Sequence, residues 1–141
     1  MAVIAGLTNS FKQEILEGVH DLSSDTINIA LYKPSADLIP STTVYSATEE
    51  VTSTNYVAGG ATLTNNGIVR SGDTVYLDFV DYVWSNVSFT VRGALIYNSE
   101  SGKGNKSIAV LDFGLDIEVS SGTFTVKFPT ADANDAIIRI K

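Results

Sequence analysis

The sequence predicts a mainly β fold, an antiparallel β-sandwich of jelly-roll type with one short N-terminal α-helix. Hydropathy alternates with a period of two residues from Thr26 onward, as expected for half-buried strands. The apolar runs are short and separated by turn-rich breaks, and about seven to nine such strands are typical of a sandwich or jelly roll. Only one stretch, near the N-terminus, has the period of a helix.

Length and composition indicate one globular domain. A chain of 141 residues suits a single core, here a helix over about 10–19 followed by a sandwich over about 26–141. Hydrophobic residues make up 44% and charged residues 18%, which is too apolar for a disordered segment. No apolar run approaches the length of a membrane span, so we expect no membrane partner.

Several classes of function are disfavoured by charge and cysteine content. The net charge of −7 opposes a phosphate backbone, so direct nucleic-acid binding is not expected. The absence of cysteine excludes disulfides, thiolate metal sites and cysteine nucleophiles. The opening "MAVIAGLTNS" lacks a basic stretch and a long apolar segment, so we expect synthesis in a cytoplasm without export.

The expected helix has one apolar face and a capping signal. Phe11, Ile15, Leu16 and Val19 fall on that face, Ser10 and Gln13 form a possible capping box, and Gly18 with "HDLSSD" ends the helix. The first strand is "TINIALY", with Ile27, Ile29 and Leu31 on one side. Further strands are expected in part of 42–51 and at 55–64, 67–70, 74–80, 87–98, 106–113, 122–128 and 136–140. Pro34 and Pro40 bracket a loop, and residues 41–54 are expected to form a surface excursion or an edge strand.

Arg92 lies inside an apolar strand, "SFTVRGALIYN", where an unpaired cation is unfavourable. In a hairpin that sets Asn98 opposite Lys106, apolar residues face apolar residues on one side of the sheet and the charged residues meet on the other side. In that register the facing pairs are Val91 with Phe113, Arg92 with Asp112, Gly93 with Leu111 and Leu95 with Ala109. We therefore expect an ion pair between Arg92 and Asp112; the alternative is that Arg92 binds an acidic group on a partner.

No residue pattern indicates catalysis or a cofactor. His20 is the only histidine, no G-x-S-x-G elbow is present, and a place at the helix C-terminus is expected for it. "SGKGNK" lacks the spacing of a phosphate loop and is expected to be a mobile hairpin tip.

The acidic residues leave a metal-site alternative open. The carboxylates that could form an acid pair or a calcium site, but whose alternation favours the solvent face, are Asp78, Asp81, Asp112, Asp116 and Glu118. In "TADANDA", Asp132, Asn134 and Asp135 favour a capped turn over calcium binding.

Most aromatic side chains are expected in the core. Phe124 and Phe128 alternate with polar residues, as a core-facing strand does. Tyr82 and Trp84 share a parity in "DYVWSN" and could instead form an exposed anchor at an interface.

With these residues in view, the chain resembles a family of small structural proteins of tailed bacteriophages. The matching stretches run in order from near residue 11 to the C-terminus: "FKQEILEGVHD", "IALY", "NYVAGGATLT", "FTVRGALIYN", "AVLDFG" and "GTFTVKFPTADANDAIIRI". The resemblance implies a non-enzymatic virion protein without catalytic residues. The size and acidic character are similar to those of cement or decoration proteins, which bind the major capsid protein and stabilise the head shell.

Other virion roles remain open at this point. The alternatives are a tail, neck or fibre adaptor, and a glycan-binding module that would use Tyr82 and Trp84. Helix 10–19 or the 33–54 excursion would dock on the partner. Copies of the chain would associate with one another, with an edge strand near 42–51 extending a sheet between them.

Overall fold

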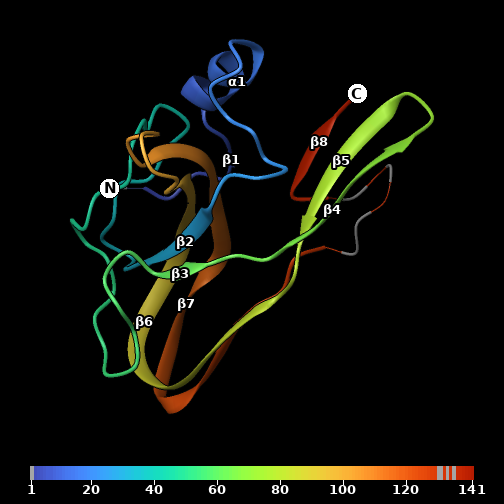
Figure 1. Ribbon diagram of the computed structural model, residues 1–141. Helices are drawn as coiled ribbons and strands as arrows, with labels where there is room; N and C mark the ends of the chain where they lie inside the picture. Colours follow the sequence, from blue (N-terminus) through green and yellow to red (C-terminus); the bar gives the residue numbers. More distant parts are fainter. Residues whose placement is uncertain (1, 130–131, 133, 135) are drawn as a thin grey trace.

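The computed structural model describes residues 2–129, 132, 134 and 136–141, and it contains two antiparallel β-sheets and one short helix (Figure 1). The predicted fold class is therefore confirmed. The larger sheet has the strand order β1-β7-β6-β2-β3 and the smaller sheet the order β4-β5-β8. The elements are β1 (Gly6–Leu7), α1 (Asn9–Leu16), β2 (Ile27–Tyr32), β3 (Ala61–Thr62), β4 (Asn65–Ser71), β5 (Thr74–Phe79), β6 (Tyr82–Asn98), β7 (Lys106–Val126) and β8 (Ile138–Ile140).

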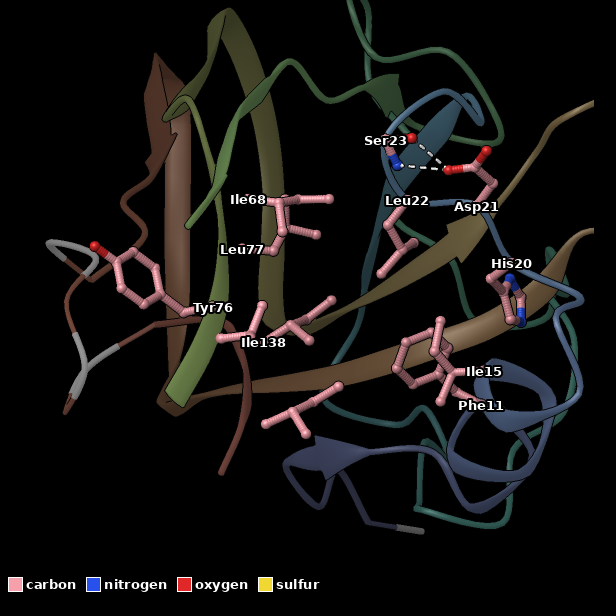
Figure 2. Close-up of a pocket in the computed structure, with 12 residues that line it drawn as sticks. Phe11, Ile15, His20, Asp21, Leu22, Ser23, Ile68, Tyr76, Leu77 and Ile138 are labelled. Atoms are coloured by element: carbon pink, nitrogen blue, oxygen red, sulfur yellow. Dashed lines mark hydrogen bonds between the residues drawn. The ribbon is translucent and has the colours of Figure 1, made fainter. Parts of the chain in front are cut away.

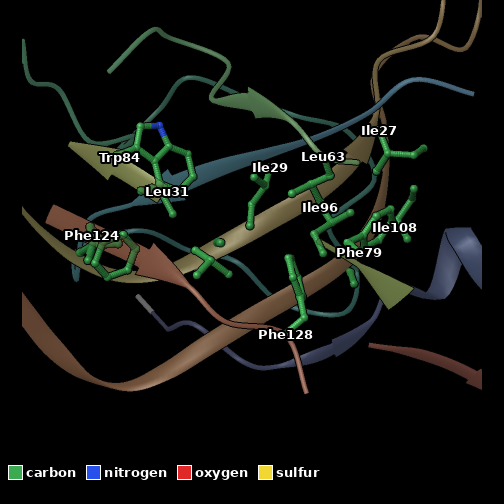
Figure 3. Close-up of a cluster of buried hydrophobic side chains, with 14 of the residues drawn as sticks. Ile27, Ile29, Leu31, Leu63, Phe79, Trp84, Ile96, Ile108, Phe124 and Phe128 are labelled. Carbon is green, nitrogen blue, oxygen red and sulfur yellow. The ribbon is translucent and has the colours of Figure 1, made fainter. Parts of the chain in front are cut away.

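The main core is built from both sheets together with α1. Figure 3 shows side chains of β2, β6 and β7 meeting Phe79 of β5, with Phe128 beside them. Phe124 and Phe128 are buried, as the sequence predicts. A second buried cluster lies on the opposite face of the larger sheet and includes Tyr32, Leu95 and Tyr97. Strand β2 and the second half of β6, residues 93–98, are consequently buried on both faces.

Strands β6 and β7 form one long hairpin with several bulges, and the predicted register is wrong over most of it. Asn98 does face Lys106, but an irregularity between Ile96 and Tyr97 shifts the remaining pairs, so that Gly93 faces Asp112 rather than Leu111. Glycine is required at position 93 because a Cβ there would lie 2.5 Å from both the Leu111 carbonyl oxygen and Val3 Cγ1. The one-residue shift itself comes from Ile108 of β7, which is left without a partner between Ser107 and Ala109, and an alternation argument does not detect such a bulge.

The helix is shorter than predicted and has a different cap. It ends at Leu16 rather than near residue 19, and Thr8 is the N-cap, with its Oγ1 accepting a hydrogen bond of 3.4 Å from the Phe11 N–H. Ser10 instead lies 3.4 Å from the hydroxyl of Ser107. Thr8 is fully buried against β7, so a tertiary contact selects the cap.

The strands differ from the prediction in several places. Residues 42–51 form no strand, and only Ala61–Thr62 is a strand within 55–64. β6 begins at Tyr82, and the two strands predicted at 106–113 and 122–128 are the continuous strand β7. Strand β1 was not predicted because it is only two residues long, too short to show an alternation of apolar and polar residues. Among the described residues, no helix is long and apolar enough to cross a membrane.

Candidate functional site

The connection between β2 and β3, residues 33–60, is an ordered loop without a helix or strand, and we call it the 33–60 loop. Loops longer than about 12–15 residues without secondary structure are uncommon and often functional. Backbone hydrogen bonds tie it to several parts of the fold. They join Ile4 N–H to Leu38 O at 2.8 Å, Asn9 N–H to Pro40 O at 2.8 Å and Tyr45 N–H to Asn105 O at 3.0 Å.

The carboxylate of Glu50 organises the inside of this loop. The residue is only 5% exposed, and three donors satisfy its oxygens. The hydroxyls of Tyr45 and Tyr56 each donate at 2.6 Å, and the Gly59 N–H donates at 2.9 Å. Burial, followed by the hydrogen bond to Glu50, raises the pKa of both phenols well above the ordinary value. A buried carboxylate with three donors holds the loop in one conformation.

Further contacts anchor the loop to the larger sheet. Tyr32 OH donates to the Ser46 carbonyl at 2.6 Å, and Tyr97 OH donates to the Gly59 carbonyl at 2.6 Å. Gly60 has a φ of +82°, and a Cβ on it would lie 1.7 Å from the Ile29 carbonyl oxygen. The loop therefore passes too close to β2 for any larger residue at position 60.

The fixed loop presents apolar side chains to solvent. Val57 is 73% exposed and Val44 is 46% exposed. A shallow hollow of about 450 Å³ lies between the start of the loop and β6, and its lining includes Pro34, Val51 and Phe89. An ordered loop that exposes apolar side chains and also borders a hollow is suited to contact with another protein.

A second feature is an apolar groove of about 340 Å³ between α1 and the smaller sheet, which we call the α1–sheet groove. In Figure 2, Phe11 and Ile15 of α1 face Ile68, Leu77 and Ile138 of the sheet across this space. Val75 and Ile140 are opposite one another in the register, on the same face of the sheet as Leu77. The sheet extends past the core here, so Ile68, Val75 and Ile140 remain 47%, 36% and 56% exposed.

The two walls of the groove differ in charge. The segments that form the sheet side, residues 65–79 with 136–141, carry Arg70, Arg139 and Lys141 against Asp73 and Asp78, and of these cations Arg70 is on the face of Val75 and Ile68, which line the groove, whereas Arg139 alternates with the lining residues Ile138 and Ile140. The helix side, residues 9–25, carries one cation, Lys12, against Glu14, Glu17, Asp21 and Asp25. A weakly cationic sheet thus faces an acidic helix on a chain whose net charge is −7.

The structure brings Arg92 and Asp112 together, through a geometry different from the predicted one. Arg92 lies where four residues of β7 bulge out between Asp112 and Ile117, and Gly114 in this bulge has a φ of +83°. Arg92 Nε is 2.9 Å from Asp112 Oδ1, and Nη1 is 3.3 Å from Asp116 Oδ1. The Gly114 N–H and then the guanidinium lower the pKa of Asp112. The carboxylates of Asp112 and Asp116 thus both pair with Arg92 within the chain.

The structure places Tyr82 and Trp84 in contact with one another, but it does not expose Trp84. Their ring centroids are 4.5 Å apart, and Trp84 is only 5% exposed because Tyr56 and Phe124 also pack near it. The interpretation of Trp84 as an exposed anchor is therefore wrong. The glycan-binding alternative loses the exposed aromatic pair on which it depended.

His20 is buried beyond the end of α1, whereas the sequence places it at the helix terminus. Asn98 Nδ2 lies 3.0 Å from Nδ1 of its ring, and Glu14 Oε1 lies 3.1 Å from Nε2. Asn98 also donates to Asp25 Oδ2 at 2.7 Å. With these partners His20 joins α1 to β6 and has no free nitrogen for a ligand.

No metal site is found among residues 2–129, 132, 134 and 136–141, where no group of three or more His, Cys, Asp or Glu residues could hold an ion. In the turn near the C-terminus, the Asn134 N–H donates to Asp132 Oδ1 at 2.7 Å. Asp135, the third residue of the predicted turn, lies outside the described residues.

Comparison of the chain with protein-family models, curated proteins and solved structures gives no match in any of the three. The candidate sites consequently rest on the chain's own geometry. Sequence reasoning missed both the Glu50 network and the α1–sheet groove. The strands that line the groove were predicted, but their uncovered ends depend on how the two sheets are offset.

Proposed function

We propose that this chain is a structural protein of a tailed-phage virion and acts as a cement protein that binds the major capsid protein through the 33–60 loop. The observation that carries the proposal is the buried Glu50 carboxylate with its three donors. It fixes a long irregular segment that carries exposed apolar side chains, Val44 and Val57. A loop of this kind is a binding surface rather than a connection of minimal length.

Preorganisation favours binding by this loop. A flexible loop loses conformational entropy when it docks, whereas a loop that is already ordered retains most of its binding free energy. Val44 and Val57 would lie against the partner, with the hollow between the loop and β6 taking a partner side chain. Modest contacts then suffice, because many copies act together on one shell.

Charge is consistent with the same role. A chain of net charge −7 is repelled by packaged nucleic acid and attracted to basic patches on the outside of a shell. The sequence resemblance to small tailed-phage structural proteins supplies the virion setting. A tail, neck or fibre adaptor with the same fold is the alternative, and copy number separates it from a cement protein.

Quantification of the chain in purified particles tests the proposal. A cement protein is expected at about the stoichiometry of the major capsid protein. A small multiple of three or six copies would place it in the tail or neck, and its absence from purified particles would overturn the virion role.

A variant pair tests the docking surface. Val57→Asp, in the 33–60 loop, is expected to weaken rebinding to particles stripped of the protein by about tenfold or more, because it places a charge in an apolar contact. Leu115→Asp is the matched control, since Leu115 is 60% exposed in the β7 bulge, outside the loop. Equal loss of rebinding in both variants would contradict docking by the loop.

A further inference from the structure

We propose that the α1–sheet groove receives Leu16 from a second copy of this chain, in a two-fold symmetric contact where each copy inserts one Leu16 and accepts another. At 89% exposure, Leu16 is the most exposed large apolar side chain among the described residues. It directly follows Ile15, which lines the groove. Because the inserting and accepting surfaces adjoin on one copy, a two-fold axis beside the end of α1 can bring both contacts together.

The chemistry of the groove suits an aliphatic side chain. Its volume of about 340 Å³ is at the lower end of the range of about 300–1,000 Å³ for small-molecule pockets. The polar side chains of His20 and Asp21 on its margin already have partners in the same chain. His20 bonds Glu14 and Asn98, and Asp21 Oδ1 accepts the Ser23 N–H at 3.1 Å. What is left for a ligand is mainly the apolar surface of Ile68, Val75 and Ile140.

Charge complementarity identifies the occupant as another copy. Copies with a net charge of −7 repel one another over most of their surface. The smaller sheet, with Arg70, Arg139 and Lys141 against Asp73 and Asp78, carries a slight excess of cations, and the segment around Leu16 is acidic. Glu17 follows Leu16, and Arg70 lies opposite Val75 on the groove side of β4. Insertion of Leu16 thus brings Glu17 of one copy towards Arg70 of the other.

The contact is distinct from docking on a shell. It uses α1, β4, β5 and β8, whereas the proposed capsid contact uses the 33–60 loop. Self-association therefore does not depend on the virion role, and either proposal can fail without the other. The groove contact replaces the sequence-based prediction that a strand at 42–51 extends a sheet between copies, because residues 42–51 form no strand.

Sedimentation equilibrium of the full chain gives the first test. The wild type is expected to form dimers at micromolar to millimolar concentration, and Leu16→Glu is expected to raise the dimer dissociation constant at least tenfold. Leu16 is so exposed that the substitution leaves the core intact, which near-ultraviolet circular dichroism checks. Leu115→Glu is the matched control and should dimerise like the wild type. A monomeric wild type, or an unchanged Leu16→Glu dimer, would overturn the proposal.

Cross-linking tests which surfaces meet. The chain has no cysteine, so single cysteines can be introduced without background. A mixture of Leu16→Cys with a mass-tagged Ile140→Cys chain is expected to form a disulfide-linked heterodimer under mild oxidation. Leu115→Cys mixed with the same Ile140→Cys chain should give at least tenfold less of that product. Equal yields from the two mixtures would show that Leu16 does not enter the groove.

Discussion

Tyr56 donates a hydrogen bond of 2.6 Å to the buried carboxylate of Glu50, and the same hydroxyl accepts a bond of 2.8 Å from the Leu31 N–H. One phenol thus joins the 33–60 loop to strand β2. Glu50 itself lies opposite Tyr32 in an isolated bridge. The shape of the proposed binding surface therefore depends on a few buried polar groups rather than on strand pairing.

Removal of the Glu50 charge should destabilise the protein. Glu50→Gln replaces a charged acceptor by an amide whose NH₂ group opposes the donors around it. We expect the free energy of unfolding to fall by about 2–4 kcal/mol, measured by urea denaturation. Glu118→Gln, at an exposed position of β7, is the matched control and should change it by less than about 0.5 kcal/mol. Equal effects in the two variants would contradict the structural role of Glu50.

Stability should fall in alkaline solution. The pKa of Tyr56 is raised above its ordinary value of 10.0, chiefly by burial and then by Glu50. The protonated phenol is therefore favoured in the folded state, so its contribution is fully present below about pH 10 and is lost as pH rises through the higher folded pKa. We expect the free energy of unfolding to decrease above pH 10, with a shallower decrease in Tyr56→Phe. Identical slopes for the two proteins would refute this.

Asp112 should stabilise the folded protein at neutral pH and lose this contribution in acid, whereas Tyr56 loses its contribution in alkali. Its pKa is lowered from 3.8 by the Gly114 N–H and by Arg92. The ionised form is favoured in the folded state, so the contribution is present above about pH 3.8 and disappears as pH falls through the lower folded pKa. Asp112→Asn should therefore show a weaker loss of stability on acidification.

A double-mutant cycle tests the partner of Asp112. Arg92→Ala and Asp112→Ala, alone and together, should give a favourable coupling in thermal denaturation, because the two charges interact directly. Zero coupling in the isolated protein would favour the alternative that Arg92 acts at an interface.

Gly60 offers a sharp test of how closely the loop approaches β2. Gly60→Ala would place a Cβ 1.7 Å from the Ile29 carbonyl, so we expect a loss of about 3 kcal/mol or more in thermal or urea unfolding. Gly104→Ala is the control because Gly104 also has a positive φ, +66°, with nothing within 4 Å of a Cβ. It should lose only about 1–2 kcal/mol from backbone strain. A similar loss in both would mean that the loop lies farther from β2.

The regular strands were predictable because their side chains alternate. β2 matches the predicted first strand, and β5 is within one residue of 74–80. Arg92 and Asp112 were paired correctly from charge and apolar pattern, although the register around them was wrong. The long side chain of Arg92 spans a one-residue shift, whereas backbone pairing does not tolerate it.

The surface excursion over 33–54 was predicted and is confirmed as part of the 33–60 loop, but the contacts that order this loop could not be derived from local patterns. "TTVYSATEEV" alternates well enough to suggest a strand, yet Glu50 turns inward to three donors and Glu49 has a φ of +62°. Long-range hydrogen bonds outweigh β propensity here, because a buried carboxylate must be satisfied. The α1–sheet groove was missed for a related reason, since the exposure of Ile140 depends on packing between segments far apart in the sequence.

A particle reconstruction that locates the chain tests the central proposal most directly. The expected result is density for this fold repeated over the outer surface of the head shell, with the 33–60 loop and Val57 against the major capsid protein. Density confined to the tail, or a shell-bound chain that turns the 33–60 loop to solvent, would contradict the proposed cement role of that loop.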